Sequence, residues 1–434
     1  MKRSSATLRR NLVAVAGAAV LWMGLPSPAH AAGGHLDATF RSGGTVVTDF
    51  AGHIDIGYPM ALQPDGKIVV AGESGLDGNP KFALARYNPD GSLDRTFGGD
   101  GKIRTDFTAN EEVAYGIAIQ CECKIVAAGT SGGYAKFALA RYNPNGSLDT
   151  TFGGDGKVTT DFTPNSDYAY GMAIQADGKI VAAGDAGATN SDGKFAVARY
   201  NTNGSLDTTF GGDGKVTTDL TSYPDDGLAM AIQADQRIVV VGGAGFGAPN
   251  EKFGLVRYNP NGTLDTTFGG DGKVTTDFGP EPDVVFGVAI QANGRIVAAG
   301  GSSLGPTNNP KFALARYTTN GSLDATFGGD GKRTTDFTPG DDDAYSVAIQ
   351  ANGKIVAAGQ SGGPNPKFAL VRYNANGILD STFRGDGKRT TDFTNAYDSV
   401  YTVLIQPDGK ILAAGVAGLG GPNGNFALAR YLAA

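Results

Sequence analysis

Seven copies of one repeating unit constrain this chain more than any other feature. The pattern LDxTF begins at Leu36, Leu93, Leu148, Leu206, Leu264, Leu323 and Leu379, with spacings of 57, 55, 58, 58, 59 and 56 residues. A second pattern, F-[AG]-[LV]-[AV]-R-Y, begins at Phe82, Phe137, Phe195, Phe253, Phe312, Phe368 and Phe426. Self-similarity at a fixed period is typical of architectures whose units stack to bury one another's apolar faces.

Each unit divides into about four short strands. In the third unit these are residues 170–175 (strand a, YGMAIQ), 179–184 (strand b, KIVAAG), 194–200 (strand c, KFAVARY) and, ahead of them, 157–162 (strand d, KVTTDF). Turn signals such as Ala-Asp-Gly separate neighbouring strands. Since no segment keeps a helical period, the chain is predicted to be all-β.

The two ends of the chain predict how the repeats close. The repeats begin with a d strand at residues 45–50 and end with a c strand at residues 426–431, so the last unit lacks a d strand of its own. Pairing the first d strand with the last unit removes unpaired edges, which promote aggregation. We therefore predict a seven-bladed β-propeller with four-stranded blades, in which the N-terminal strand completes the last blade. A linear β-solenoid is the alternative, but it would not need an extra d strand at one end of the repeats and a missing d strand at the other.

Residues 1–31 are predicted to be a secretory signal peptide. Four basic residues lie among the first ten, residues 12–25 are mostly apolar, and residues 29–31 (AHA) match an A-x-A cleavage site. The pair Arg9-Arg10 is compatible with the twin-arginine export route, so both this route and the Sec route are possible for the leader. Residues 32–434 then form a single propeller domain, which is expected to be secreted, outside the cell or on its surface.

Charge narrows the choice of partners. The formal net charge is −7, and loss of the four leader cations would change it to −11. An acidic chain lacks the Lys/Arg excess that binds phosphate, so nucleic acid and anionic membranes are not expected as partners. No second segment is apolar enough to span a membrane. The expected partner is an extracellular protein, a glycan or a small molecule, and the protein is expected to be a monomer.

Residues suited to catalysis are scarce. Trp22, the only tryptophan, and His30 belong to the leader, which leaves His35 and His53 as the only histidines of the mature chain. Too few histidines therefore remain for a multi-histidine metal site, and a Ser-His-Asp triad could use only one of these two. The sequence favours a non-catalytic binding or scaffold propeller. The alternative is a calcium-dependent hydrolase or lactonase with a carboxylate-lined central channel.

Cysteine occurs at only two positions, Cys121 and Cys123, in one a–b turn. Two cysteines so close in sequence could close a small, strained disulfide in an oxidising compartment. A reactive pair or a soft-metal site is the alternative.

Two charged positions recur in every unit. Strand c carries Arg86, Arg141, Arg199, Arg257, Arg316, Arg372 and Arg430, and strand d carries Asp49, Asp106, Asp161, Asp219, Asp277, Asp336 and Asp392. Because strands c and d are neighbours, we expect one partly buried ion pair between these two positions in each blade.

An acid also recurs at the start of every a strand. The set is Asp55, Glu112, Asp167, Asp225, Asp283, Asp342 and Asp398. Three residues further on, the side chain is aromatic in six of seven units. Strand a is the innermost strand of a blade, so the acids are expected to ring the mouth of the central channel. Each acid either caps a turn through backbone N–H groups or helps to hold a cation, most plausibly calcium, or a polar ligand.

The segments LDxTFGGDGKVTTDF, AIQxDGKIVAAG and FALARYNPNGSL resemble the delta-60 repeat family of bacterial secreted and surface proteins. The resemblance extends over residues 35–431 and implies a β-propeller. It implies no settled activity. The b–c loops vary in length between units, and they share one face with the d–a loops, so recognition is expected on that face.

Overall fold

The computed structural model describes residues 33–433, apart from residues 42, 51, 53, 76–78, 188–191, 249, 304–308, 364 and 421–423. The predicted signal peptide and His53 lie outside the described residues. No helix in the described part of the chain is long and apolar enough to cross a membrane.

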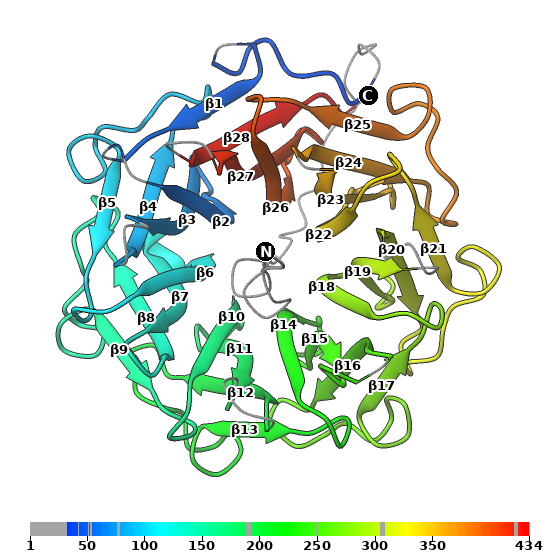
Figure 1. The fold of residues 1–434 in the computed structure, drawn as a ribbon. Helices are drawn as coiled ribbons and strands as arrows, with labels where there is room; N and C mark the ends of the chain where they lie inside the picture. The colour runs from blue at the N-terminus through cyan, green and yellow to red at the C-terminus, as the bar shows by residue number, and fades with distance from the viewer. Residues whose placement is uncertain are drawn as a thin grey trace.

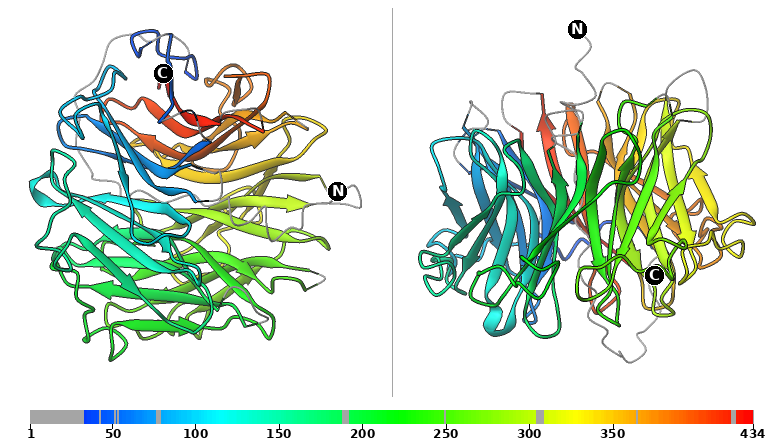
Figure 2. Two further views of the ribbon diagram at one scale, coloured as in Figure 1. Left: turned by 60° about the vertical axis from the view of Figure 1, so that its left-hand side comes forward. Right: turned by 90° about the horizontal axis from the view of Figure 1, so that it is seen from below.

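Seven four-stranded antiparallel sheets surround a central axis (Figure 1). In each sheet the first strand of the unit lies nearest the axis and the last lies at the rim, and the strands run roughly along the axis (Figure 2). The fold is the predicted seven-bladed, all-β propeller. One 3-10 turn, η1 (Cys121–Cys123), is the only helical element among the described residues.

Six blades are continuous in sequence. The first is β2 (Asp55–Leu62), β3 (Ile68–Ser74), β4 (Lys81–Tyr87) and β5 (Lys102–Thr105). The second is β6 (Glu112–Ile119), β7 (Ile125–Ser131), β8 (Lys136–Tyr142) and β9 (Lys157–Thr160). The third is β10 (Asp167–Ile174), β11 (Ile180–Ala186), β12 (Lys194–Tyr200) and β13 (Lys215–Thr218). The fourth is β14 (Asp225–Ile232), β15 (Ile238–Ala244), β16 (Lys252–Tyr258) and β17 (Lys273–Thr276). The fifth is β18 (Asp283–Ile290), β19 (Ile296–Ser303), β20 (Pro310–Tyr317) and β21 (Lys332–Thr335). The sixth is β22 (Asp342–Ile349), β23 (Ile355–Ser361), β24 (Lys367–Tyr373) and β25 (Lys388–Thr391).

The seventh blade joins the two ends of the described chain. It consists of β26 (Tyr397–Ile405), β27 (Ile411–Leu419), β28 (Asn425–Tyr431) and β1 (Thr45–Thr48). Val46 pairs with Leu428, and Val47 pairs with Ala427. The predicted closure of the ring is confirmed.

The apolar core lies between neighbouring blades. Phe82 and Leu84 of β4, for example, are fully buried and pack in one cluster with Ile117 of β6 and Ala127 of β7. Each sheet is therefore covered on both faces by its neighbours, which explains why strands a to c are buried almost throughout.

Polar contacts also join each blade to the next. The Tyr87 hydroxyl donates to Thr48 Oγ1 of the preceding blade at 2.8 Å. The equivalent pairs are Tyr142–Thr105, Tyr200–Thr160, Tyr258–Thr218, Tyr317–Thr276, Tyr373–Thr335 and Tyr431–Thr391. A buried hydroxyl needs such a partner, and here the partner fixes the spacing of the blades.

The prediction of an ion pair between strands c and d is wrong. Arg86 Nε donates instead to Asp94 Oδ2 of the LDxTF motif at 2.8 Å. Asp106 of the following loop pairs with Lys81, at the other end of strand c, at 3.0 Å. The reason is the antiparallel register: Phe82 lies opposite Thr105, so the end of strand d meets the start of strand c.

Candidate functional site

The seven acids at the start of the a strands lie at the predicted end of the channel and are fully buried. Each has an exposed fraction of 0%. In the third blade, Asp167 Oδ2 accepts hydrogen bonds from the backbone N–H groups of Phe162 at 2.7 Å and Thr163 at 3.1 Å. Asp167 Oδ1 accepts from the Thr163 hydroxyl at 3.0 Å and from Gly187 N–H, in the b–c loop, at 3.1 Å.

The other six acids accept in the same way from the d–a turn. Their donors are the backbone N–H groups of Phe50, Phe107, Leu220, Phe278, Phe337 and Phe393. The turn-capping interpretation thus describes what these carboxylates contact.

The fit of this ring to calcium is poor. Calcium takes six to eight oxygen ligands around one ion, and most ring carboxylates face N–H donors of the d–a turn that leads into their own blade. No group of three or more His, Cys, Asp or Glu residues able to hold a metal ion occurs in the described part of the chain. The metal and ligand roles of the ring stay predictions.

The aromatic position of strand a fills the channel. Its members pack into one buried cluster, which we call the central plug: Tyr58, Tyr115, Tyr170, Leu228, Phe286, Tyr345 and Tyr401. Each is at most 6% exposed. The ring centroid of Tyr58 lies 5.1 Å from that of Tyr115 and 5.1 Å from that of Tyr401. This separation is typical of packed aromatic pairs. The plug therefore blocks the channel beneath the capping acids.

Between the capping acids and the plug lies a layer in which the repeats differ. It is formed by the residue that follows each capping acid and by the sixth residue of each b strand, and we call it the mouth layer. The a-strand members are Ile56, Val113, Tyr168, Asp226, Val284, Asp343 and Ser399. The b-strand members are Glu73, Thr130, Asp185, Gly243, Gly301, Gln360 and Val416. Flanking positions hardly change, so this layer breaks the sevenfold symmetry.

Glu73 is the most clearly placed acid of the mouth layer. It is 3% exposed, and its Oε1 accepts a hydrogen bond from the Tyr58 hydroxyl at 2.9 Å. Burial raises the pKa of Glu73 to about 7, and the negative charge of Glu111 adds to the effect. At neutral pH this carboxyl is present in both protonated and ionised forms.

Asp185 and Asp226 bring two carboxyl groups together from adjacent blades. Asp185 is 3% exposed, and its Oδ1 is buried without a hydrogen-bond partner among the described residues. Burial and the repulsion of Asp226 raise the pKa of Asp185 well above its usual value. A protonated Asp185 removes the repulsion between the two groups, because two adjacent carboxylates cannot readily ionise together.

Asp343 and Gln360 form the third polar cluster. Gln360 Nε2 donates to Asp343 Oδ2 at 3.3 Å, and the Tyr397 hydroxyl donates to Gln360 Oε1. Burial raises the pKa of Asp343 to about 7, with a contribution from the charge of Asp341. An added Cβ on Gly301 would lie 2.2 Å from Asp343 Oδ1, so glycine leaves the space that this carboxylate occupies.

The mouth layer thus presents carboxyl, amide and phenol groups above an apolar floor. Carboxyls that titrate near neutral pH can donate or accept hydrogen bonds, or transfer a proton. The sequence pattern that located the ring acids did not locate Glu73 and Asp185. The sequence did carry a signal for them, since the sixth position is the one that varies most in chemical type among the b strands.

The cysteine turn lies on the opposite face. Cys121 is exposed, Cys123 is half-buried, and the two thiols are free in the structure. The backbone of Glu122 and Cys123 is left-handed, with φ of 61° and 57°. The disulfide stays a prediction that an intact-mass measurement with and without reductant would test.

Comparison with known proteins gives a family and a fold. A family model described as "Domain of unknown function (DUF5122) beta-propeller" matches residues 63–97, 124–152, 175–210, 233–268, 291–327, 350–383 and 406–433. No curated protein matches the chain.

Among solved structures, a streptogramin B lyase is 12% identical, with 89% of this chain and 98% of that chain covered and a TM-score of 0.51. Sqt1 of Chaetomium thermophilum bound to the N-terminus of ribosomal protein L10 is 10% identical, covering 88% and 98%, with a TM-score of 0.47. A putative gluconolactonase is 10% identical, covering 70% and 89%, with a TM-score of 0.35. The similarity to the lyase, at 12% identity, shows the propeller fold alone.

Proposed function

Because the chain belongs to the DUF5122 β-propeller family, a family of unknown function, we propose a role from its own residues. The protein is a secreted, non-catalytic binding propeller that recognises a hydroxyl-rich ligand, such as a glycan, at the mouth layer. The observation that carries the proposal is that Glu73, Asp185, Asp343 and Gln360 all belong to the mouth layer, where the repeats differ. The basic and apolar leader at residues 1–31 supports secretion.

The chemistry of the layer favours a neutral polar ligand. Glu73 and Asp343, with pKa values of about 7, supply both donors and acceptors at neutral pH. Gln360 adds an amide, and the half-buried Tyr168 and Tyr397 add aromatic surface with polar ends. The acidic character of the layer disfavours anionic ligands by repulsion.

A glycan array tests this proposal. The mature chain is compared with the double variant Glu73→Gln/Asp343→Asn, which keeps the size of both side chains, and with Glu122→Gln on the opposite face. We expect the mature chain and Glu122→Gln to bind the same glycans and the double variant to lose about tenfold or more in affinity. Equal binding by all three proteins, or no glycan bound by any, would contradict it.

A hydrolase or lactonase is the second candidate, and the raised pKa of Asp185 favours it. A carboxyl whose pKa is raised by burial suits a general acid, and Asp226 beside it supplies a second carboxyl. Hydrolysis of a panel of lactones, with and without calcium, tests this candidate. Activity that Asp185→Asn abolishes and Glu122→Gln retains would replace the binding proposal. A calcium-dependent rise in melting temperature that Asp167→Asn removes would restore the ring acids as a metal site.

A further inference from the structure

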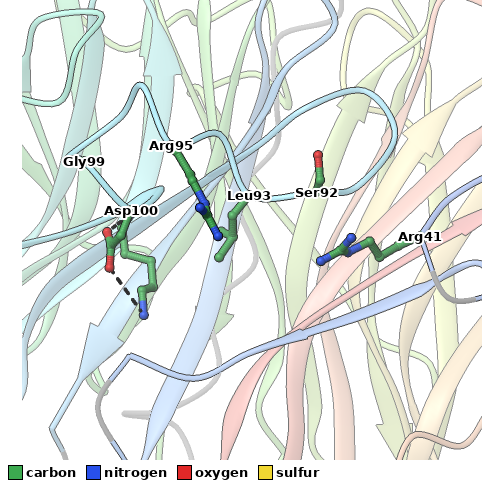
Figure 3. A pocket seen from close by; sticks show the side chains of 7 residues that line it. Arg41, Ser92, Leu93, Arg95, Gly99 and Asp100 are labelled. Atoms are coloured by element: carbon green, nitrogen blue, oxygen red, sulfur yellow. Dashed lines mark hydrogen bonds and ion pairs between the residues drawn. The ribbon is translucent and has the colours of Figure 1, made fainter.

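A second site lies on the opposite face, where the last blade meets the first. Here a hollow of about 500 Å³ is lined by Arg41, Ser92, Leu93, Arg95, Gly99, Asp100 and Lys102 (Figure 3). Arg41 precedes β1 of the seventh blade, Lys102 begins β5 of the first blade, and the other residues belong to the c–d connection of the first blade. Figure 3 shows the guanidinium groups of Arg41 and Arg95 pointing into the space around Leu93.

Both arginines depart from the repeat. At the position of Arg95, the other six units have Ala38, Thr150, Thr208, Thr266, Ala325 and Ser381. At the position of Arg41, five units have Gly98, Gly153, Gly211, Gly269 and Gly328, and the last unit has Arg384. Only the junction of the seventh and first blades therefore combines two arginines across one hollow.

The two guanidinium groups have no hydrogen bond or ion pair with any side chain in the described part of the chain, whereas Arg384 does. Arg384 Nη1 lies 2.8 Å from His35 Nε2, so the equivalent arginine of the sixth blade is occupied. Hydrogen bonds from Ser92 are the main causes that lower the pKa of Asp90, and the charge of Arg41 does add to their effect. Lys102 adds a third cation, 3.6 Å from Asp100 Oδ2. In a chain of net charge −7, this hollow is a local concentration of positive charge.

The backbone at Arg41 is also unusual. Its φ is 44°, in the left-handed region where five repeats have glycine. A side chain with a Cβ is disfavoured there, so the repeat offers no structural reason for arginine at this position. Arg384, at the equivalent position of the sixth blade, shares this backbone conformation with a φ of 57°, so it is the combination with Arg95 that distinguishes Arg41.

We propose that this hollow binds an oxyanion, a carboxylate or phosphate group, between Arg41 and Arg95. Planar guanidinium groups suit such anions because each can donate two parallel hydrogen bonds. Lys102 adds to the positive electrostatic potential of the hollow. Leu93 offers an apolar surface for the carbon skeleton of the ligand. The site is separate from the mouth layer and does not depend on the function proposed for it.

Isothermal titration at low ionic strength tests the site with two probes, inorganic phosphate and glucuronate. The mature chain is compared with Arg41→Gly/Arg95→Thr, which installs residues found in the other repeats and should fold normally. Arg384→Gly is the matched control, because it makes the same change at the equivalent position of the sixth blade. We expect at least one probe to bind the mature chain and Arg384→Gly equally, and the double variant to bind about tenfold or more weakly.

Binding of phosphate alone would assign a phosphate ligand, and binding of glucuronate alone would assign a carboxylate ligand. Added salt should weaken the binding, because exposed charges are screened. Binding of neither probe would overturn the proposal. Equal binding by the double variant would overturn it as well.

Discussion

Asp94 and Glu73 are both buried, yet the pKa of Asp94 is lowered to about 2 whereas that of Glu73 is raised to about 7. Burial alone would raise both pKa values. Around Asp94, hydrogen bonds from Thr96 and the charge of Arg86 outweigh burial. Glu73 has only the Tyr58 hydroxyl in compensation. The LDxTF aspartates therefore act as ionised structural groups, and Glu73 titrates near neutral pH.

Removing a charge from an LDxTF aspartate is expected to destabilise the propeller strongly. Asp207 accepts from Arg199 at 2.8 Å and from Lys179 at 3.0 Å, so Asp207→Asn leaves a buried arginine without its counter-charge. We expect a loss of about 3 kcal/mol in the free energy of unfolding, measured with urea. The exposed Asp213→Asn, in the same connection, should change it by less than about 0.5 kcal/mol. Similar values for the two variants would contradict the structural role.

The free energy of unfolding should depend on pH in a way that reflects the raised pKa of Glu73. Its pKa rises from 4.5 in the unfolded chain to about 7 in the fold, so the fold favours the protonated form. Its contribution is complete below pH 4.5 and is lost as the pH rises through 7. Between these values, Glu73→Gln should lose less stability than the wild type, by an amount on the order of 2–3 kcal/mol. Urea unfolding across this range measures the difference, and parallel curves would be inconsistent with the raised pKa.

Residue-level prediction from the sequence was uneven for a physical reason. The ring acids recur in every repeat, so the periodicity alone located Asp167 and its equivalents at the start of strand a. The partner of Arg86 depended on which end of strand d meets which end of strand c, and this is set by the register of the sheet. Periodicity could not locate Glu73, because its position carries a different residue in both neighbouring repeats.

At the scale of elements, the a–b turn between β6 and β7 shows what one changed turn does. Where the third blade has Gly178 at φ 83°, this turn has Cys123 at φ 57°. The turn still forms, as η1, because the pairing of β6 with β7 holds both of its ends. Sequence singled out this turn but could not give its backbone conformation.

Cys123→Gly should therefore stabilise the protein. Glycine adopts the left-handed conformation without steric penalty, so we expect a gain of about 1 kcal/mol in the free energy of unfolding under reducing conditions. Gln236→Gly, at the equivalent position of the β14–β15 turn with φ 68°, should give a gain of the same sign. Loss of stability in both variants would contradict this account of the turns.

At the scale of the whole molecule, closure is the feature on which the two faces and the mouth layer depend. It could be predicted because the repeats are offset at the two ends, and because an unpaired edge is unfavourable. The contents of the channel could be predicted only in part. The aromatic period was visible, but its packing into a plug requires seven a strands at a fixed distance from one axis.

Hydrogen–deuterium exchange of the mature chain tests closure most directly. If β1 completes the seventh blade, amides of Thr45–Thr48 and Asn425–Tyr431 will be protected to the same degree as those of β9 and β8 in the second blade. If the ring is open, β28 is an edge strand that still pairs with β27. The amides of Thr45–Thr48, and those amides of β28 that would otherwise bond to β1, will then exchange at the rate of unpaired chain. That result would remove the channel mouth and the junction hollow together.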